Sequence, residues 1–178
     1  VLRDALFETE KILKKEINAS TDNPLVFETG ESGEIKYETK SGGNFHGEIL
    51  AHAADRLCDA LTSAANISDR RFYALLNPKH SYGLPADLAG KSDLNTGLMI
   101  LQYSTAALVS EMKKISNPSG IDSIPTSAGQ EDYVSMGTIS AKYLRKIVDM
   151  GRNVIAAELM AASQGIYLSS EELGEYAK

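Results

Sequence analysis

Residues 94–115 read LNTGLMILQYSTAALVSEMKKI, and this stretch decides the fold class. Apolar or small side chains recur along it at alternating steps of four and three residues, at Leu94, Leu98, Leu101, Thr105, Leu108, Met112 and Ile115. This spacing places the side chains along a single face of a helix, as in the seam of a coiled coil. The stretch therefore predicts a long helix that packs lengthwise against other helices.

Three further segments show helical spacing and flank this stretch on both sides. The first covers residues 2–17, the second covers residues 49–76, and the last runs from about residue 130 to about residue 166. In the first segment we expect an inward face formed by Leu2, Leu6, Thr9, Leu13 and Ile17. In the last segment we expect a buried stripe formed by Leu144, Val148, Ile155, Leu159, Ala162 and Ile166. Small residues near that stripe, such as Gly151 and Ala157, favour close contact between helices.

The segments between these helices contain turn residues and one pair of short strands. Residues 25–27 and 35–37 are apolar or aromatic-rich, and the polar link between them contains two glycines, which is typical of a β-hairpin. Residues 78–93 contain spread-out prolines and glycines and are expected to be irregular. Together these patterns predict an all-α fold over a single domain, residues 1–178. It is an elongated bundle of long, mostly antiparallel helices with one short β-hairpin near the N-terminus.

The composition argues against several classes of function. The chain of 178 residues has a formal net charge of −6, with 24% charged residues. An acidic balance without a basic stripe argues against nucleic acid or an anionic membrane as a partner. Charged residues interrupt every apolar run that could span a bilayer. With a single cysteine, Cys58, and three histidines, we expect neither a disulfide within the chain nor a dedicated metal site, and we expect a cytoplasmic location.

Three loops between the predicted helices contain side chains that could bind a zwitterionic small molecule. Asn23 could hydrogen-bond a carboxylate, and Phe45 could pack against a planar ring or cofactor. Glu131, at the predicted start of the last helix, could act as a base or bind a cationic group. Each residue also has an ordinary structural interpretation. Asn23 could be a turn residue before a proline, Phe45 could anchor its loop, and Glu131 could be a partner of the helix dipole.

As strings of residues, these loops resemble one enzyme family. Residues 18–27, NASTDNPLVF, precede residues 41–46, SGGNFH, and residues 122–132, DSIPTSAGQED, in the order found in the aromatic amino acid ammonia-lyases and aminomutases. Within that family the chain is most similar to the histidine ammonia-lyases, over about residues 5–166. The resemblance implies an all-α enzyme that forms a homotetramer around a central helical bundle. It also implies a methylidene-imidazolone electrophile, made from an Ala-Ser-Gly tripeptide, and the conversion of L-histidine to urocanate and ammonia.

The resemblance implies a role for each of the three loop residues. Asn23 matches an active-site asparagine near the electrophile and the substrate carboxylate, and Phe45 matches the phenylalanine packed near the electrophile. Glu131 matches the glutamate at the end of the pocket that receives the substrate side chain. A carboxylate suits an imidazole, which offers N–H donors, whereas a phenyl ring would leave the carboxylate unpaired. Glu131 therefore favours histidine over phenylalanine or tyrosine as the substrate.

The sequence also departs from the family pattern. No Ala-Ser-Gly occurs in it, and the family's substrate-binding tyrosine and arginine fall just before Val1. Gly129 and Tyr133 stand where asparagine and histidine are expected. We therefore interpret the chain as the C-terminal half of a histidine ammonia-lyase, a carbon–nitrogen lyase that is inactive without an N-terminal half carrying the electrophile.

Two alternatives remain open beside this interpretation. One is a phenylalanine or tyrosine ammonia-lyase or aminomutase on the same scaffold, and the other is a non-catalytic helical assembly protein. In each case we expect self-association to a dimer or tetramer, because an isolated pair of such helices would leave an apolar stripe in water. We expect the contact to involve the stripe of residues 94–115 and the small-residue face of the last helix.

Overall fold

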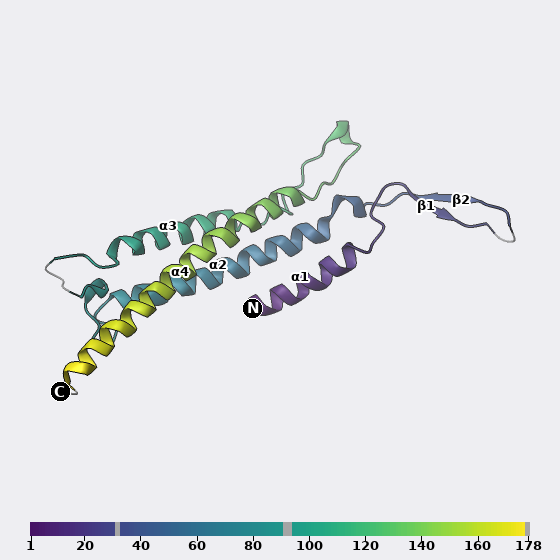
Figure 1. Cartoon of the computed structure of the whole chain (residues 1–178). Coiled ribbons are helices and arrows are strands. Elements are labelled where there is room, and N and C mark those ends of the chain that lie inside the picture. Colours follow the sequence, from purple (N-terminus) through teal and green to yellow (C-terminus); the bar gives the residue numbers. More distant parts are fainter. Residues whose placement is uncertain (31–32, 91–93, 177–178) are drawn as a thin grey trace. The chain divides into compact units, whose positions relative to one another are not determined.

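The computed structural model describes residues 1–30, 33–90 and 94–176, with side chains up to residue 169. The four α-helices within these residues are α1 (Leu2–Glu16), α2 (Glu48–Leu76), α3 (Met99–Ile115) and α4 (Gly137–Tyr176) (Figure 1). A two-stranded hairpin lies between α1 and α2 along the chain. The predicted fold class, mostly helical with one hairpin near the N-terminus, is thereby confirmed. No helix in the described part of the chain is long and apolar enough to cross a membrane.

The hairpin pairs β1 (Leu25–Glu28) with β2 (Tyr37–Lys40) in antiparallel register, so that Leu25 faces Lys40. The first strand lies where the sequence predicts it. The second begins at Tyr37, two residues later than predicted, although the Thr29 N–H donates to the carbonyl of Lys36 at 2.9 Å and continues the backbone pairing one step beyond the two strands. Residues 31–32 of the predicted polar link lie outside the described residues, as do residues 91–93 of the predicted irregular segment.

The chain divides into two compact units. Unit 1 contains Val1–Leu57 and Pro118–Leu144, and unit 2 contains Cys58–Asn117 and Arg145–Lys178.

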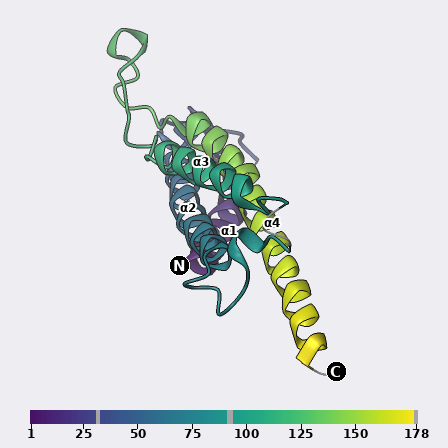
Figure 2. The ribbon, with the colours of Figure 1, turned by 90° about the vertical axis from the view of Figure 1, so that its left-hand side faces the viewer.

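In unit 1, α1 lies beside the first part of α2 and runs antiparallel to it (Figures 1 and 2). Ile12 of α1 lines the same pocket as Ile49 and Ala53 of α2. The inward face of α1 contains Ala5 and Thr9, which are 2% and 7% exposed. The prediction for this helix was right for Thr9 but wrong for three larger residues, which are exposed: Leu6, Leu13 and Ile17. Ala5, Thr9 and Ile12 also follow four-three spacing, and this second face is the one that turns inward.

In unit 2, the second part of α2 lies beside α3, which runs in the opposite direction. The side chain of Thr62 hydrogen-bonds Ser116, whereas Asp69 accepts from Thr105. The core here contains Phe72, Leu76, Leu88, Ala161 and Leu168. The predicted stripe of α3 is buried or half-buried from Leu98 to Ile115, as the sequence predicts.

The helix α3 begins five residues later than the sequence predicts, and Leu94 is exposed. The cause lies at Gly97, which has a φ of +53°. A Cβ at this position would lie 2.2 Å from the carbonyl oxygen of Asp87. The Leu98 N–H donates to that same oxygen at 2.8 Å. This close approach of two backbones holds the chain in a non-helical turn until Leu98.

The last helix, α4, differs from its prediction in its start, its end and its buried face. It begins at Gly137, whose N–H is capped by the hydroxyl of Ser135, and it continues ten residues past the predicted end. Three residues of the predicted buried stripe are exposed: Ile155, Leu159 and Ile166. The face that is buried instead contains Ile147, Gly151, Val154, Ala157, Ala161 and Leu168. Small residues let neighbouring elements approach this face. Met112 comes so close to residue 151 that a Cβ added to this glycine would contact the Met112 side chain.

This arrangement also corrects the expected surface for self-association. Most of the surface named for it is buried or half-buried within unit 2 itself, namely the α3 stripe from Leu98 to Ile115 and the small residues Gly151, Ala157 and Ala161 of α4. Within unit 2, the larger apolar side chains that the described part of α4 leaves in solvent are Ile155, Leu159, Met160, Ile166 and Tyr167.

Candidate functional site

The three predicted site residues all belong to unit 1. Asn23 lies in the turn that leads into β1. Phe45 lies in a single 3-10 turn, η1 (Asn44–His46), directly before α2. Glu131 lies in the loop that precedes α4.

Asn23 is tied to the segment that contains Phe45. Its side-chain oxygen accepts hydrogen bonds from the hydroxyl of Ser41 at 2.9 Å and from the backbone N–H of Gly42 at 3.2 Å. These two contacts fix the orientation of the amide. The amide nitrogen of Asn23 has no partner among the described residues, so it can donate to a ligand.

Phe45 and Glu131 contact the same imidazole, that of His46. The ring centroids of Phe45 and His46 are 4.1 Å apart, and Phe45 is 42% exposed. Nε2 of His46 lies 2.9 Å from Oε2 of Glu131, whose side chain is 34% exposed. Gly47 follows with a left-handed φ of +66°, which ends the 3-10 turn and allows α2 to begin at Glu48. Two of the three predicted residues thus meet around a histidine that the sequence analysis did not select.

The position of Glu131 corrects one sequence-based interpretation. The residue lies in a tight loop and not in the first turn of a helix, so it is not a partner of the α4 dipole. Its backbone pairs with that of Thr126, whose N–H donates to the Glu131 carbonyl at 2.9 Å. Ser127, Ala128 and Gly129 between them all have positive φ, and this backbone conformation is incompatible with the predicted helix start.

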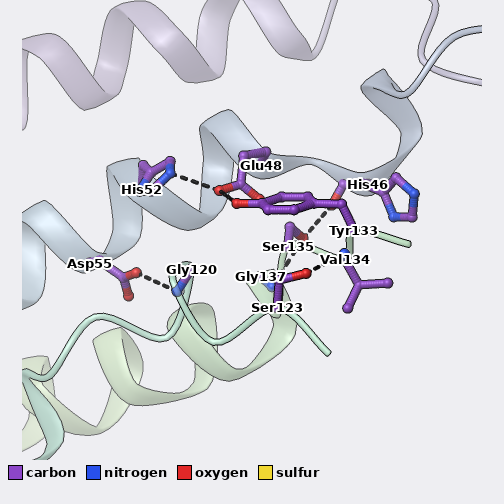
Figure 3. A network of polar contacts seen from close by, with 10 residues as sticks. All are labelled: His46, Glu48, His52, Asp55, Gly120, Ser123, Tyr133, Val134, Ser135 and Gly137. Carbon is purple, nitrogen blue, oxygen red and sulfur yellow. Dashed lines mark hydrogen bonds and ion pairs between the residues drawn. The ribbon is translucent and has the colours of Figure 1, made fainter. Parts of the chain in front are cut away.

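A network of polar contacts joins this loop to the start of α2, and Figure 3 shows it from close by. Oε1 of Glu48 accepts from the hydroxyl of Tyr133 at 3.0 Å, and it lies 2.7 Å from Nε2 of His52. The hydrogen bond to Glu48 raises the pKa of the Tyr133 phenol above its usual value. The hydroxyl of Ser135 donates to the backbone carbonyl of His46. These contacts hold the loop around Glu131 against the first turns of α2.

The sequence analysis assigned no role to three residues of this neighbourhood: His46, Glu48 and Tyr133. The four-residue spacing of Glu48 and His52 was a usable signal, because it places the two side chains on one helix face. The contact of His46 with Glu131 had no local signal, since the two residues are far apart in the chain. Within the described residues, no group of three His, Cys, Asp or Glu side chains could hold a metal ion.

Comparisons with known proteins show which proteins this chain resembles. A family model described as aromatic amino acid lyase matches residues 1–178. The histidine ammonia-lyase of Alkaliphilus oremlandii is 51% identical over 174 residues, which are 97% of this chain and 33% of that protein. The histidine ammonia-lyase of Deinococcus radiodurans is 50% identical over 163 residues, which are 92% of this chain and 30% of that protein. The chain therefore spans about a third of the length of the curated relatives it matches.

Solved structures show the same similarity. The crystal structure of histidine ammonia-lyase from Trypanosoma cruzi is 45% identical with a TM-score of 0.84, over 94% of this chain and 32% of that one. A tyrosine aminomutase from Streptomyces globisporus is 36% identical with a TM-score of 0.86, over 94% of this chain and 31% of that one.

Proposed function

The chain belongs to the aromatic amino acid lyase family, and from this premise we propose that it is part of a histidine ammonia-lyase, which converts L-histidine to urocanate and ammonia. One observation supports histidine as the substrate. Glu131 presents a partly exposed carboxylate in a loop that the start of α2 supports. A carboxylate is a suitable partner for the N–H groups of an imidazole. The curated relatives named above, all histidine ammonia-lyases at about half identity, support the same choice.

Each of the three site residues has a part in this proposal. The amide nitrogen of Asn23 donates a hydrogen bond to the substrate carboxylate, Phe45 packs beside the electrophile, and Glu131 binds the substrate imidazole. The exposed Phe45 and the amide nitrogen of Asn23, which has no partner among the described residues, fit a planar, electron-poor group such as a methylidene-imidazolone. That group, when present, withdraws electrons from the amino acid so that its β-proton can leave with ammonia.

The electrophile has to come from outside the 178 residues, because they contain no Ala-Ser-Gly. We therefore propose that residues 1–178 act together with a polypeptide that carries this tripeptide, either in the same chain or as a separate one. Urocanate absorbs strongly in the near ultraviolet, so its formation from histidine is a direct assay. We expect no urocanate from residues 1–178 alone, and turnover once the electrophile-bearing part is also present. Turnover by the 178 residues alone would contradict the need for that part.

An alternative substrate follows from the likeness to a tyrosine aminomutase structure, since Glu131 could also accept a hydrogen bond from a phenol. Assays with histidine, tyrosine and phenylalanine distinguish these possibilities, and faster turnover of tyrosine or phenylalanine would overturn the choice of histidine.

We also propose that the protein self-associates through the exposed apolar face of α4. Ile155, Leu159 and Ile166 are 47%, 63% and 72% exposed, and they recur at helical spacing. A second copy would remove these side chains from water, which favours a dimer or a tetramer. A cytoplasmic location remains a prediction.

A further inference from the structure

We propose that His46 is the positioning residue of Glu131. Its imidazole donates an N–H to one carboxylate oxygen and leaves the other oxygen for the side chain of the substrate. The inference rests on the proposed function, in which Glu131 receives the substrate imidazole. It adds a residue through which the binding geometry is set.

The contact between the two side chains is short and partly shielded from water. Nε2 of His46 lies 2.9 Å from Oε2 of Glu131, and the two side chains are 20% and 34% exposed. Water competes less for a hydrogen bond in such surroundings than for one on an open surface. Among the described residues, His46 is the side chain that contacts this carboxylate.

His46 is itself held by contacts on several sides. Its carbonyl accepts from the hydroxyl of Ser135, and its backbone N–H donates to the carbonyl of Gly43 at 3.2 Å. The ring of Phe45 lies against its imidazole. Figure 3 shows that the imidazole points away from Glu48, the partner of His52, so the two histidines serve different carboxylates. The position of His46 is therefore fixed, unlike that of a mobile surface side chain.

Glu131 needs such a donor because of where it lies. A loop fixes its side chain less well than a helix or strand would, and a binding group must be held close to its working geometry. A carboxylate has two oxygens and accepts several hydrogen bonds. With Oε2 bound to His46, a substrate N–H meets Oε1 in one orientation, and less side-chain freedom is lost when the substrate binds.

Two substitutions of His46, by asparagine and by glutamine, distinguish the positioning role from a general structural role. Glutamine places its amide nitrogen near the position of Nε2, whereas asparagine is one methylene shorter and cannot reach Glu131. In the assembled enzyme, which includes the part that carries the electrophile, we expect His46→Asn to lower kcat/KM for histidine about tenfold, mainly through KM. His46→Gln should stay within about threefold of the wild type. The exposed His80 in unit 2 supplies the matched control, His80→Asn, which should leave kcat/KM unchanged.

The decisive measurement repeats His46→Asn in a Glu131→Ala background. If His46 acts through the carboxylate, the second substitution should change kcat/KM less than about twofold once that carboxylate is gone. A tenfold loss in both backgrounds, or no loss in either, would overturn the inference and leave the proposed function standing. If the wild-type enzyme does not turn over histidine, the proposed function fails and the inference fails with it. If His46→Asn does not fold, His46→Ala, which also has no group that reaches Glu131, replaces it in both backgrounds with the same expected losses and the same grounds for rejection.

Discussion

Replacing Glu131 with glutamine would test how the candidate site recognises the proposed substrate. Glutamine keeps the length and shape of the side chain but has one acceptor oxygen where the carboxylate has two. In the structure, His46 already binds one of the two oxygens at 2.9 Å. The single oxygen of glutamine would remain with His46, and its NH2 group would then face the imidazole N–H of the substrate, so that two donors meet.

The size of the loss follows from this geometry. The substrate loses a hydrogen bond to a charged acceptor, which contributes about 1.5–3 kcal/mol. Since about 1.36 kcal/mol corresponds to a tenfold change in rate, kcat/KM for histidine should fall by about 10- to 150-fold. If His46 did not occupy one oxygen, glutamine could turn its oxygen toward the substrate. Only the charge assistance would then be lost, about 1 kcal/mol or about fivefold.

Initial rates of urocanate formation at several histidine concentrations measure this loss in the assembled enzyme. Asp132→Asn is a suitable control, because it removes a negative charge from the exposed neighbouring position without changing Glu131. Slow turnover of phenylalanine, where detectable, should not fall with Glu131→Gln. A loss below about threefold, an equal loss in the Asp132 variant or an equal loss for phenylalanine would refute the proposed contact between Glu131 and the substrate imidazole.

Three further predictions concern stability and assembly. Thr105 donates to the buried carboxylate of Asp69 at 2.6 Å, so Thr105→Val should lower the free energy of unfolding by about 2 kcal/mol in urea titrations. The exposed control Thr138→Val should not, and equal losses would contradict the buried contact. The hydrogen bond from Arg71 holds the pKa of Glu158 below its usual value of 4.5. The ionised Glu158 therefore contributes stability above about pH 4.5, which is lost as the pH falls through the lower folded value. Melting temperatures measured from pH 6 downward should fall less steeply for Glu158→Gln than for the wild type, and identical slopes would count against this linkage. Leu159→Glu should weaken self-association in sedimentation equilibrium, whereas a wild type that stays monomeric at every concentration would exclude the α4 contact.

The sequence predicts the helices well where a single apolar face is present, as in α2, whose end at Leu76 matches the sequence signals. It fails for α4 because that helix has two apolar faces. Spacing and side-chain size favour the larger residues, such as Leu159, yet the buried face is the one with Gly151 and Ala161, which lets other elements come close. Periodicity alone cannot choose between two such faces, since the choice depends on the shape of the neighbouring elements.

For the candidate site, local patterns find residues but not their neighbours. Asn23, Phe45 and Glu131 lie in loops with recognisable motifs, and they were selected for that reason. These loops are held together by tertiary contacts, which local patterns do not reveal. The hydrogen bond from Ser41 to Asn23 and the 2.9 Å contact of His46 with Glu131 join residues that no helical or strand period relates. A start of α4 near residue 130 was also expected, because nothing in the sequence marks the left-handed backbone of Ser127 and Ala128.

That turn has a consequence for how such proteins diverge. An insertion into a helix rotates every later side chain by about 100° per residue and would disturb the contacts of the buried face. Glu131 instead closes a turn with Thr126, and residues 127–130 form its tip. Insertions, deletions and exchanges at the tip can reorient the carboxylate while α4 keeps its register. With Glu131 in its proposed role, mutational tolerance and substrate choice coincide in one short segment, where new specificities can arise during evolution without altering the helical scaffold.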